Sequence, residues 1–192
     1  MNYRDELNKR IGVFQELNEE AFSQLDAITA LMFEAIKNGN KVMTCGNGGS
    51  AANAQHITGD IVGRYKIERE AFAGLSLTVD PSVMTATGND YGYDEVFARQ
   101  VEGLGREGDV LVVLSSSAQS PNLIKAVLAA GEKGIKTVGI LGNHGGGIIE
   151  HLDEGLTFAF KGSDLVEETA MTLFHIMLMD LEQKLTENKN NE

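Results

Sequence analysis

The chain has 192 residues, a length that suits one domain or one domain with a helical extension. Hydrophobic residues make up 42% of the chain and charged residues 23%, which is typical of a soluble globular protein. Acidic residues outnumber basic ones 28 to 16, and the net charge of −12 repels nucleic-acid phosphates. We therefore expect no direct nucleic-acid contact.

Two further features bear on the cellular compartment. No apolar run follows the opening sequence MNYRDELNKR, and no stretch approaches the roughly 20 apolar residues of a membrane span. We therefore expect neither a signal peptide nor a membrane contact. Cys45 is the single cysteine, which excludes an intramolecular disulfide and fits a reducing compartment. The sequence predicts a cytoplasmic protein.

Apolar residues between Tyr3 and Lys37 recur mostly at spacings of three and four, which is helical periodicity. The Asn-Gly-Asn run at residues 38–40 ends the pattern with a glycine suited to a left-handed cap. The segment is either two helices or one helix broken near Asn18. Its apolar face must pack on this domain or on a second subunit.

After residue 41, five short apolar runs alternate with helical stretches. Short apolar runs with little charge are typical of parallel strands that are buried on both faces of a sheet. The expected strands are 42–45, 75–79, 110–114, 137–141 and 156–160. The expected helices are 51–62, 82–104 with a break at 88–93, 122–133, 147–152 and 164–186. This alternation predicts an α/β fold with a doubly wound, five-stranded parallel sheet and a long C-terminal helix. We expect the domain at 41–188, an N-terminal helical extension at 1–40 and a polar tail at 189–192.

The first expected strand runs directly into a glycine-rich loop, CGNGGS at residues 45–50. Glycines let backbone N–H groups converge on a ligand, and we expect Ser50 to cap the next helix, whose N-terminal end favours an anion. No G-x-G-x-x-G pattern and no Walker lysine are present, so we expect no nucleotide cofactor. A tight turn that needs glycine only for steric reasons is the alternative.

The third expected strand runs into a serine-rich loop, SSSAQSP at residues 115–121. We expect Ser120 to cap the following helix and Pro121 to be its first residue. Hydroxyls and free amides at a helix N-terminus suit a phosphate, and open α/β sheets bind ligands beyond the carboxyl ends of their strands. Together the two loops predict a phosphorylated ligand. A solvated polar linker is the alternative.

Five segments in order carry a resemblance to a known family: CGNGGSAANAQH from residue 45, GRY at 63–65, GNDYGYDEVFARQVE from 88, REGDVL from 106, and the serine-rich loop. The chain resembles the sugar-isomerase (SIS) domain family, and within it the bacterial phosphoheptose isomerases, over essentially its whole length. The resemblance implies conversion of sedoheptulose 7-phosphate to D-glycero-D-manno-heptose 7-phosphate, a precursor of the lipopolysaccharide core. It also implies a homotetramer with sites between subunits, and one zinc ion per subunit in some members.

The resemblance further implies which residues form the site. His56 matches a metal ligand of the family, and His175 matches both a ligand and a catalytic acid/base. We expect the substrate and its phosphate to be bound by Asn47, Gly48, Gly49, Ser50, Asn89, Asp90, Ser115, Ser116, Ser117, Ser120 and Glu167.

The chain departs from the family pattern in three places. The family glutamate four residues after the first histidine, which moves the proton, is Asp60 here, and the glutamine eight residues before the last histidine is Glu167. The usual loop STSGNS reads SSSAQS at 115–120. Aspartate is one methylene shorter than glutamate, about 1.5 Å, so an active site requires a compensating shift or a water relay.

Isomerisation through an enediol needs a base at C1/C2, a partner that returns the proton, and polarisation of the carbonyl. His56 and Asp60 are four residues apart on an expected helix and face the same way, which suits a base or two ligands of one metal. Glu167 precedes His175 by about two helical turns, although Glu168 is in better register with it. We expect Asp60 and His175 to be catalytic. The expected zinc ligands are His56, Asp60, Glu167 and His175.

Two other functions stay open at this point. A similar SIS protein that lacks the catalytic glutamate associates with a replication-initiator protein and shares the SAANAQH run, so a non-catalytic scaffold is one alternative. The acid at Asp60 argues mildly against it, because a pure scaffold needs none. An isomerase for a different sugar phosphate is the other, and the altered serine-rich loop permits it.

Overall fold

The computed structural model describes residues 1–160 and 162–190. The strands are β1 Val42–Gly46, β2 Gly74–Ser76, β3 Val110–Ser115, β4 Lys136–Leu141 and β5 Glu154–Thr157. The helices are α1 Tyr3–Gln15, α2 Glu19–Lys37, α3 Gly49–Val62, α4 Pro81–Tyr91, α5 Ala98–Leu104, α6 Pro121–Glu132 and α7 Ser163–Asn190. The 3₁₀ turns are η1 Tyr93–Glu95, η2 Asn143–Gly145 and η3 Ile149–His151.

The strands form one sheet in the order β2-β1-β3-β4-β5, and every neighbouring pair is parallel. The predicted α/β fold with a five-stranded parallel sheet is therefore confirmed. Strands β1 and β3 are buried along their whole length because helices cover both faces of the sheet. The strand order changes direction between β1 and β3, which is where open α/β sheets bind their ligands.

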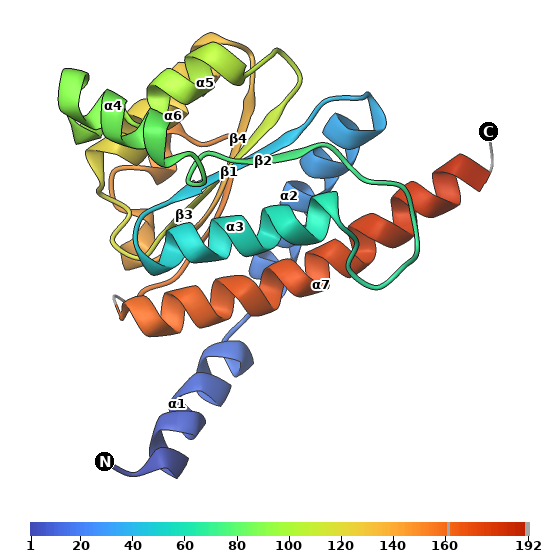
Figure 1. Cartoon of the computed structure of the whole chain (residues 1–192). Coiled ribbons are helices and arrows are strands. Elements are labelled where there is room, and N and C mark those ends of the chain that lie inside the picture. The colour runs from blue at the N-terminus through green and yellow to red at the C-terminus, as the bar shows by residue number, and fades with distance from the viewer. Residues whose placement is uncertain (161, 191–192) are drawn as a thin grey trace.

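Two helical layers cover the sheet (Figure 1). Helices α2, α3 and α7 pack on one face, in an apolar core that contains the fully buried side chains of Ile28, Ile57 and Phe174. Helices α5 and α6 pack on the other face, around Phe97 and Leu123. The two cores come from the two sides of the same strands, since successive residues of a strand point to opposite faces.

The N-terminal segment forms two separate helices, which decides between the two predicted alternatives. Asn18 begins α2 by accepting a hydrogen bond from the N–H of Ala21 at 3.0 Å. Helix α1 buries none of its residues and stands out from the body of the molecule (Figure 1). Arg10 ties it to α7 through ion pairs of 2.9 Å with Asp164 and 2.6 Å with Glu168. Among the described residues, no helix has both the length and the apolar character that crossing a membrane requires.

Helices α3 and α7 lie side by side and run in the same direction (Figure 1). Asn53, in the second turn of α3, donates to the backbone carbonyl of Glu167 at 2.9 Å. Just beyond the end of α3, the N–H of Tyr65 donates to Glu182 at 2.7 Å. These partners are 114 and 117 residues apart along the chain, so a similar offset at both ends aligns the facing sides of the two helices between them.

Several element bounds differ from the prediction. Strand β2 ends at Ser76, and β5 covers Glu154–Thr157 and not 156–160, because short apolar runs do not mark where ladder pairing stops. The segment 147–152 holds only one 3₁₀ turn. The break expected at 88–93 falls at Gly92, whose φ of +94° suits glycine. Helix α7 runs to Asn190, so 189–190 of the expected tail are helical, and 191–192 lie outside the described residues.

Candidate active site

The glycine-rich and serine-rich loops meet at one edge of the sheet. Strands β1 and β3 are parallel neighbours, with Gly46 paired to Leu114 at their carboxyl ends. Residues 47–49 and 116–120 follow directly from these positions. Both loops therefore lie beyond the carboxyl ends of their strands, as predicted, and the structure adds that the strand order reverses between these two strands.

A pair of amides joins the two loops. Asn47 donates to Asn122 at 2.9 Å, and Asn122 donates back to Asn47 at 2.9 Å. The hydroxyl of Tyr93 also donates to Asn47 Oδ1, at 3.1 Å. Asn122, the second residue of α6, is buried, so this reciprocal pair sets the spacing of the two loops in a protected environment.

The start of α3 differs from the prediction for Ser50. Gly48 is the N-cap, with φ +58° and ψ −123°, a conformation that residues with a side chain rarely adopt. Ser50 lies inside the first turn and is buried, so its predicted role as the cap is wrong. The first N–H groups of α3 have no partner within the helix, so this end still favours an anion.

The serine-rich loop uses one hydroxyl internally, and within the described part of the chain the others make no hydrogen bond. Ser115 is buried at the end of β3, and its Oγ accepts a hydrogen bond from the N–H of Ala118 at 3.0 Å. Ser116 is half-buried and Ser117 is exposed. Ser120 is the N-cap of α6 with Pro121 as its first residue, as predicted, but its hydroxyl makes no capping bond.

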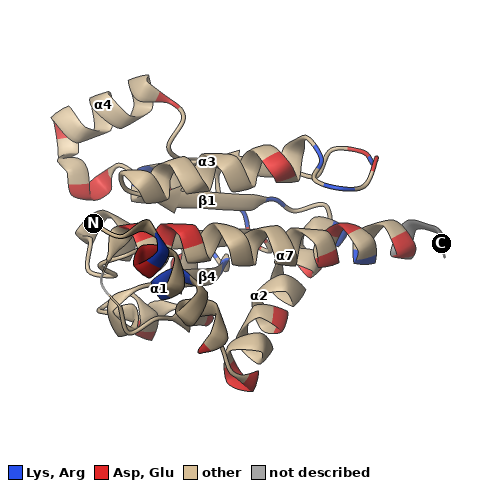
Figure 2. Cartoon of the chain, turned by 90° about the horizontal axis from the view of Figure 1, so that it is seen from below, with Lys and Arg blue, Asp and Glu red and all other residues tan. Residues whose placement is uncertain are grey.

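Asn89 and Asp90 lie at the end of α4, which stands off from the body of the molecule (Figure 2). Both side chains are exposed, and Asn89 donates to Asp90 at 2.8 Å. They make no described contact with either loop. The neighbouring Tyr93 is the residue of this segment that reaches the glycine-rich loop.

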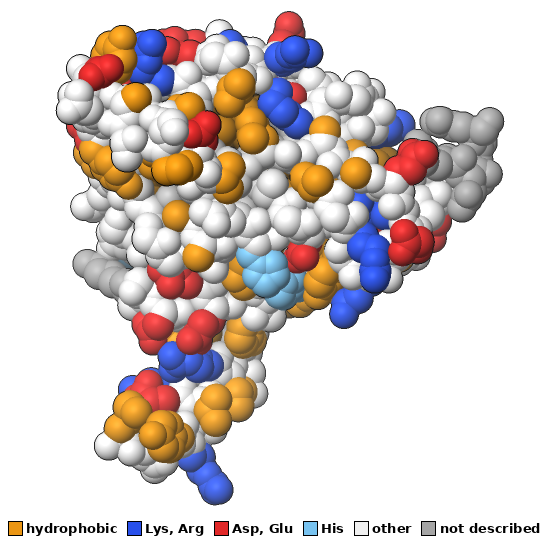
Figure 3. All heavy atoms as spheres, viewed as in Figure 1, with side chains coloured by type: hydrophobic (Ala, Val, Ile, Leu, Met, Phe, Trp, Pro, Cys, Tyr) orange, Lys and Arg blue, Asp and Glu red, His pale blue; other side chains and the backbone are white. Residues whose placement is uncertain are grey.

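His56, Asp60 and His175 form a cluster where α3 faces α7. The Nε2 atoms of His56 and His175 lie 3.5 and 3.6 Å from Asp60 Oδ2. The two imidazole rings meet edge to face, with centroids 5.2 Å apart. The His56 side chain is 55% exposed and that of Asp60 only 19%, so the cluster opens to solvent on one side. Histidine side chains are visible on this face in Figure 3.

The cluster fits a divalent cation. One ligand atom from each of the three residues lies within 4.8 Å of the other two. Asp60 Oδ2 is buried and has no hydrogen-bond partner among the described residues, since both ring nitrogens are too far away for an ordinary hydrogen bond. A buried carboxylate oxygen without a partner is costly unless a cation or a proton satisfies it. Two imidazoles and one carboxylate are a set that zinc accepts with one position open.

Glu167, a residue of α7, lies apart from this cluster and faces the start of α3. A Cβ built on Gly49 would be 2.3 Å from Glu167 Oε2, so the carboxylate lies directly against the glycine-rich loop. Burial, and then repulsion from Asp164 and Glu168, raises the pKa of Glu167. Of the four expected zinc ligands, the described structure thus groups three and places Glu167 beside the expected substrate-binding residues. Glu168, in better sequence register, instead pairs with Arg10.

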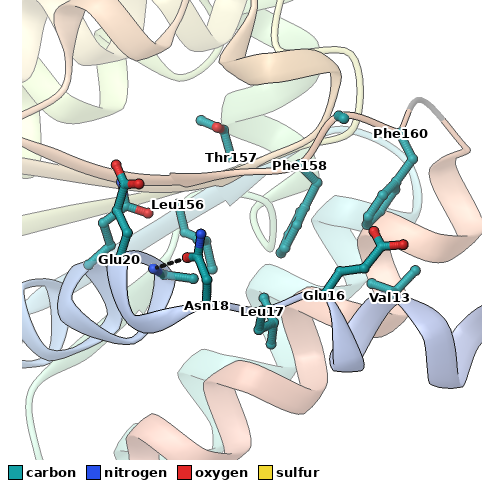
Figure 4. Close-up of a pocket in the computed structure, with 12 residues that line it drawn as sticks. Val13, Glu16, Leu17, Asn18, Glu20, Leu156, Thr157, Phe158 and Phe160 are labelled. Atoms are coloured by element: carbon teal, nitrogen blue, oxygen red, sulfur yellow. Dashed lines mark hydrogen bonds between the residues drawn. The ribbon is translucent and has the colours of Figure 1, made fainter.

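A separate hollow lies between the α1–α2 junction and the end of β5 (Figure 4). Leu17 and the stacked rings of Phe158 and Phe160 provide its apolar side, and Glu16 and Glu20 its acidic side. None of the expected site residues lines it.

Three residues around the site were not among the expected ones. Asn122 and Tyr93 contact Asn47, and the ring of Tyr65 stacks on His175 with centroids 5.1 Å apart. Tyr65 lay within the GRY motif, whereas nothing in the sequence singled out Asn122. Its position two residues after the last serine of the loop was the only available signal.

Comparison with known proteins decides the family. The SIS domain family matches residues 2–142. The phosphoheptose isomerase of Geotalea daltonii is 40% identical over 182 residues, which cover 95% of each chain. The chain belongs to the phosphoheptose isomerase family of SIS-domain proteins.

Solved members of the phosphoheptose isomerase family share the fold closely. The enzyme of Neisseria gonorrhoeae superposes with a TM-score of 0.88 at 35% identity, over 94% of this chain and 97% of that one. The phosphoheptose isomerase of Francisella tularensis gives 0.85 at 28% identity, over 95% and 100% of the two chains. The resemblance found in the sequence is confirmed, and it extends over nearly the full length of both structures.

Proposed function

We propose that this chain is a sugar-phosphate isomerase that converts sedoheptulose 7-phosphate to D-glycero-D-manno-heptose 7-phosphate, a heptose precursor for the lipopolysaccharide core. The main support for this proposal is that two anion-binding loops meet at one sheet edge. A His–Asp–His cluster lies farther along the helix that begins in the first loop. Family membership at 40% identity supports the same activity.

We place the phosphate of the substrate in the serine-rich loop. Ser116, Ser117 and Ser120 offer hydroxyls that are not buried, and α6 adds free N–H groups at its first turn. Asn47, Gly48 and Gly49 then face the sugar chain, with Glu167 beside them. His56 lies seven residues beyond Gly49, about 10 Å along the helix, so an extended sugar phosphate points its far end toward the cluster.

In the proposed reaction, Asp60 removes a proton from C1, next to the C2 carbonyl, and returns it to C2, while His175 moves the hydroxyl proton of O1 to O2. Asp60 Oδ2 and His175 Nε2 lie 3.6 Å apart, close enough for one residue to serve the two carbons and the other the two oxygens of one substrate. Asp60 is held on a helix, and its carboxylate has little solvent around it. Few water molecules therefore compete with the substrate for hydrogen bonds to this base.

Zinc is part of the proposal as a resident cofactor, one ion per subunit. His56, Asp60 and His175 would hold it, and the bound ion would supply polarisation of the substrate carbonyl. The unpartnered Oδ2 of Asp60 supports this assignment. Glu167 is proposed as a substrate-side residue, because its carboxylate faces Gly49.

We further propose a cytoplasmic homotetramer. Tyr3, Leu7 and Ile11 form one exposed apolar stripe along α1, a helix that buries no residue within its own chain. A stripe of this kind is covered when chains associate. Light scattering coupled to gel filtration gives the mass directly, and a 20.7 kDa species at micromolar concentration would contradict the tetramer.

The test of the activity is incubation with sedoheptulose 7-phosphate, with and without added zinc, following heptose phosphate formation. We expect turnover, and a fall of at least about 100-fold in Asp60→Asn with an unchanged melting temperature. Asp26→Asn, an exposed carboxylate on α2, is the matched control and should behave as the unaltered chain. A folded protein that binds the sugar without converting it would favour a scaffold, and turnover of another sugar in a substrate panel would reassign the substrate.

A further inference from the structure

The imidazole of His175 is held by packing. It makes no hydrogen bond within the described part of the chain, and its Nε2 lies 3.6 Å from Asp60 Oδ2. One of its ring neighbours is His56, which meets it edge to face. The other is Tyr65, whose ring is nearly parallel to it, with an interplanar angle of 4° and centroids 5.1 Å apart. The orientation of the His175 ring therefore depends on where Tyr65 is placed.

Tyr65 is placed by a buried carboxylate two turns further along α7. Glu182 accepts hydrogen bonds from three successive backbone N–H groups, those of Tyr65 at 2.7 Å, Lys66 at 2.7 Å and Ile67 at 3.1 Å. Its side chain is only 1% exposed. Three N–H groups converging on one carboxylate fix the backbone of this turn, and with it the direction in which the ring of Tyr65 leaves the chain.

Arg69 completes the arrangement and extends it to Asp60. Its Nε donates to Glu182 at 2.8 Å, and the side chain is 4% exposed, so the pair is shielded from water. Its Nη2 donates to the backbone carbonyl of Asp60 at 2.9 Å, in the last turn of α3. The same ion pair therefore anchors the turn that carries Tyr65 and the helix end that carries Asp60.

We propose that Tyr65, anchored by the Glu182 carboxylate, is a positioning residue that fixes the imidazole of His175 opposite Asp60. It contributes no group to the reaction. A flat ring face restricts rotation of the imidazole about its side-chain bonds, which keeps Nε2 directed at the carboxylate. The kinetic part of this inference rests on the proposed isomerase function, whereas the structural part does not.

The structural part is tested by the histidine ring resonances of the full-length chain in solution NMR at one fixed pH. A proton over the face of an aromatic ring is shielded, so we expect the His175 ring signal, assigned with His175→Gln, to lie upfield of its position in Tyr65→Leu. Tyr65→Phe should restore the upfield position, because the ring remains and the hydroxyl makes no described bond. Phe22→Leu, at an exposed aromatic residue on α2, is the matched control and should leave the signal unchanged.

The kinetic part is tested with the same variants. In Tyr65→Leu we expect kcat to fall roughly tenfold or more while KM changes less than about twofold, since the substrate-binding loops are untouched. Tyr65→Phe should recover most of kcat. A merely structural role predicts reduced stability with normal kcat in the folded fraction, and that result would overturn the proposal.

The two ways of failing are distinguishable. If the His175 resonance in Tyr65→Leu equals that of the unaltered chain, the ring is not fixed by Tyr65 and the inference is wrong, whatever the activity. If the resonance moves but kcat does not, the positioning role is wrong. If the unaltered chain converts no sugar phosphate, the proposed function fails, and the resonance still decides whether Tyr65 holds the ring.

Discussion

Asn47 and Asn122 donate to each other at 2.9 Å in both directions, so each side-chain amide uses both its donor and its acceptor on the other. The pair joins the loop after β1 to the helix after β3. Because Asn122 is buried, no water replaces a lost bond there. The spacing between the two anion-binding loops is thus set by one side chain of the first loop and one at the start of the helix that follows the second loop.

Asn122→Asp tests this link. Aspartate accepts from Asn47 but cannot donate to it, so two oxygens face each other and one hydrogen bond is lost. We expect about a tenfold rise in KM for the sugar phosphate, measured by initial rates. Asn18→Asp is the matched control, because aspartate caps a helix as well as asparagine does. An unchanged KM in Asn122→Asp would show that the loops keep their spacing without the pair.

Glu167 and Glu168 should respond oppositely to the same substitution. Burial, and then Asp164 and Glu168, raises the pKa of Glu167, so its charged form is disfavoured in the folded protein at neutral pH. Glu167→Gln should therefore raise the melting temperature at pH 7 by about 1–3 °C. Glu168→Gln should lower it slightly, because its ion pair with Arg10 is lost.

The pH dependence gives the sign of the Glu167 effect independently. A carboxyl whose folded pKa is raised stabilises the protein while protonated, and loses that contribution as the pH rises through the folded pKa. The advantage of Glu167→Gln should accordingly shrink as the pH falls toward 4, as calorimetry at several pH values would show. An advantage that grows in acid would contradict this assignment.

Glu182 should have the reverse pH behaviour. Burial alone would raise its pKa, but the N–H groups of Lys66, Tyr65 and Ile67, and then Arg69, outweigh burial and lower it. Its contribution to stability is present above the ordinary glutamate pKa and is lost as the pH falls through the lowered value. Glu182→Gln should cost about 3–5 kcal/mol at pH 7 by urea denaturation, with a smaller cost in acid. Glu132→Gln, exposed on α6, is the control.

Alanine substitutions at two glycines near the site should have opposite effects on the free energy of unfolding. A Cβ on Gly46 would lie 2.7 Å from the backbone carbonyl oxygen of Ser50, which cannot move without shifting the start of α3. Gly46→Ala should therefore destabilise by about 1–3 kcal/mol. Gly59, within α3, has open space around it, so Gly59→Ala should stabilise by up to about 1 kcal/mol. Thermal unfolding of both variants measures the contrast, and equal effects would exclude the steric explanation.

Residue patterns along the chain predict the order of the helices and strands and the edge of the sheet where the two loops lie. Apolar runs of strand length separated by helical periodicity predict parallel strands, and the carboxyl ends of such strands share one edge, so the loops after β1 and β3 were placed correctly. Local spacing likewise put His56 and Asp60 on one helical face, since four residues complete about one turn.

The distant residues that join them follow from the packing of α3 against α7. The parallel alignment of α3 and α7 brings His175 to Asp60, directs Glu167 to Gly49 instead of the cluster, and sets Glu182 beneath the turn that carries Tyr65. These pairings depend on the offset between two helices more than 100 residues apart, which packing in a shared apolar core fixes. Periodicity reports which face of a helix is buried but carries no information about its alignment along a neighbour, and that alignment determines the site.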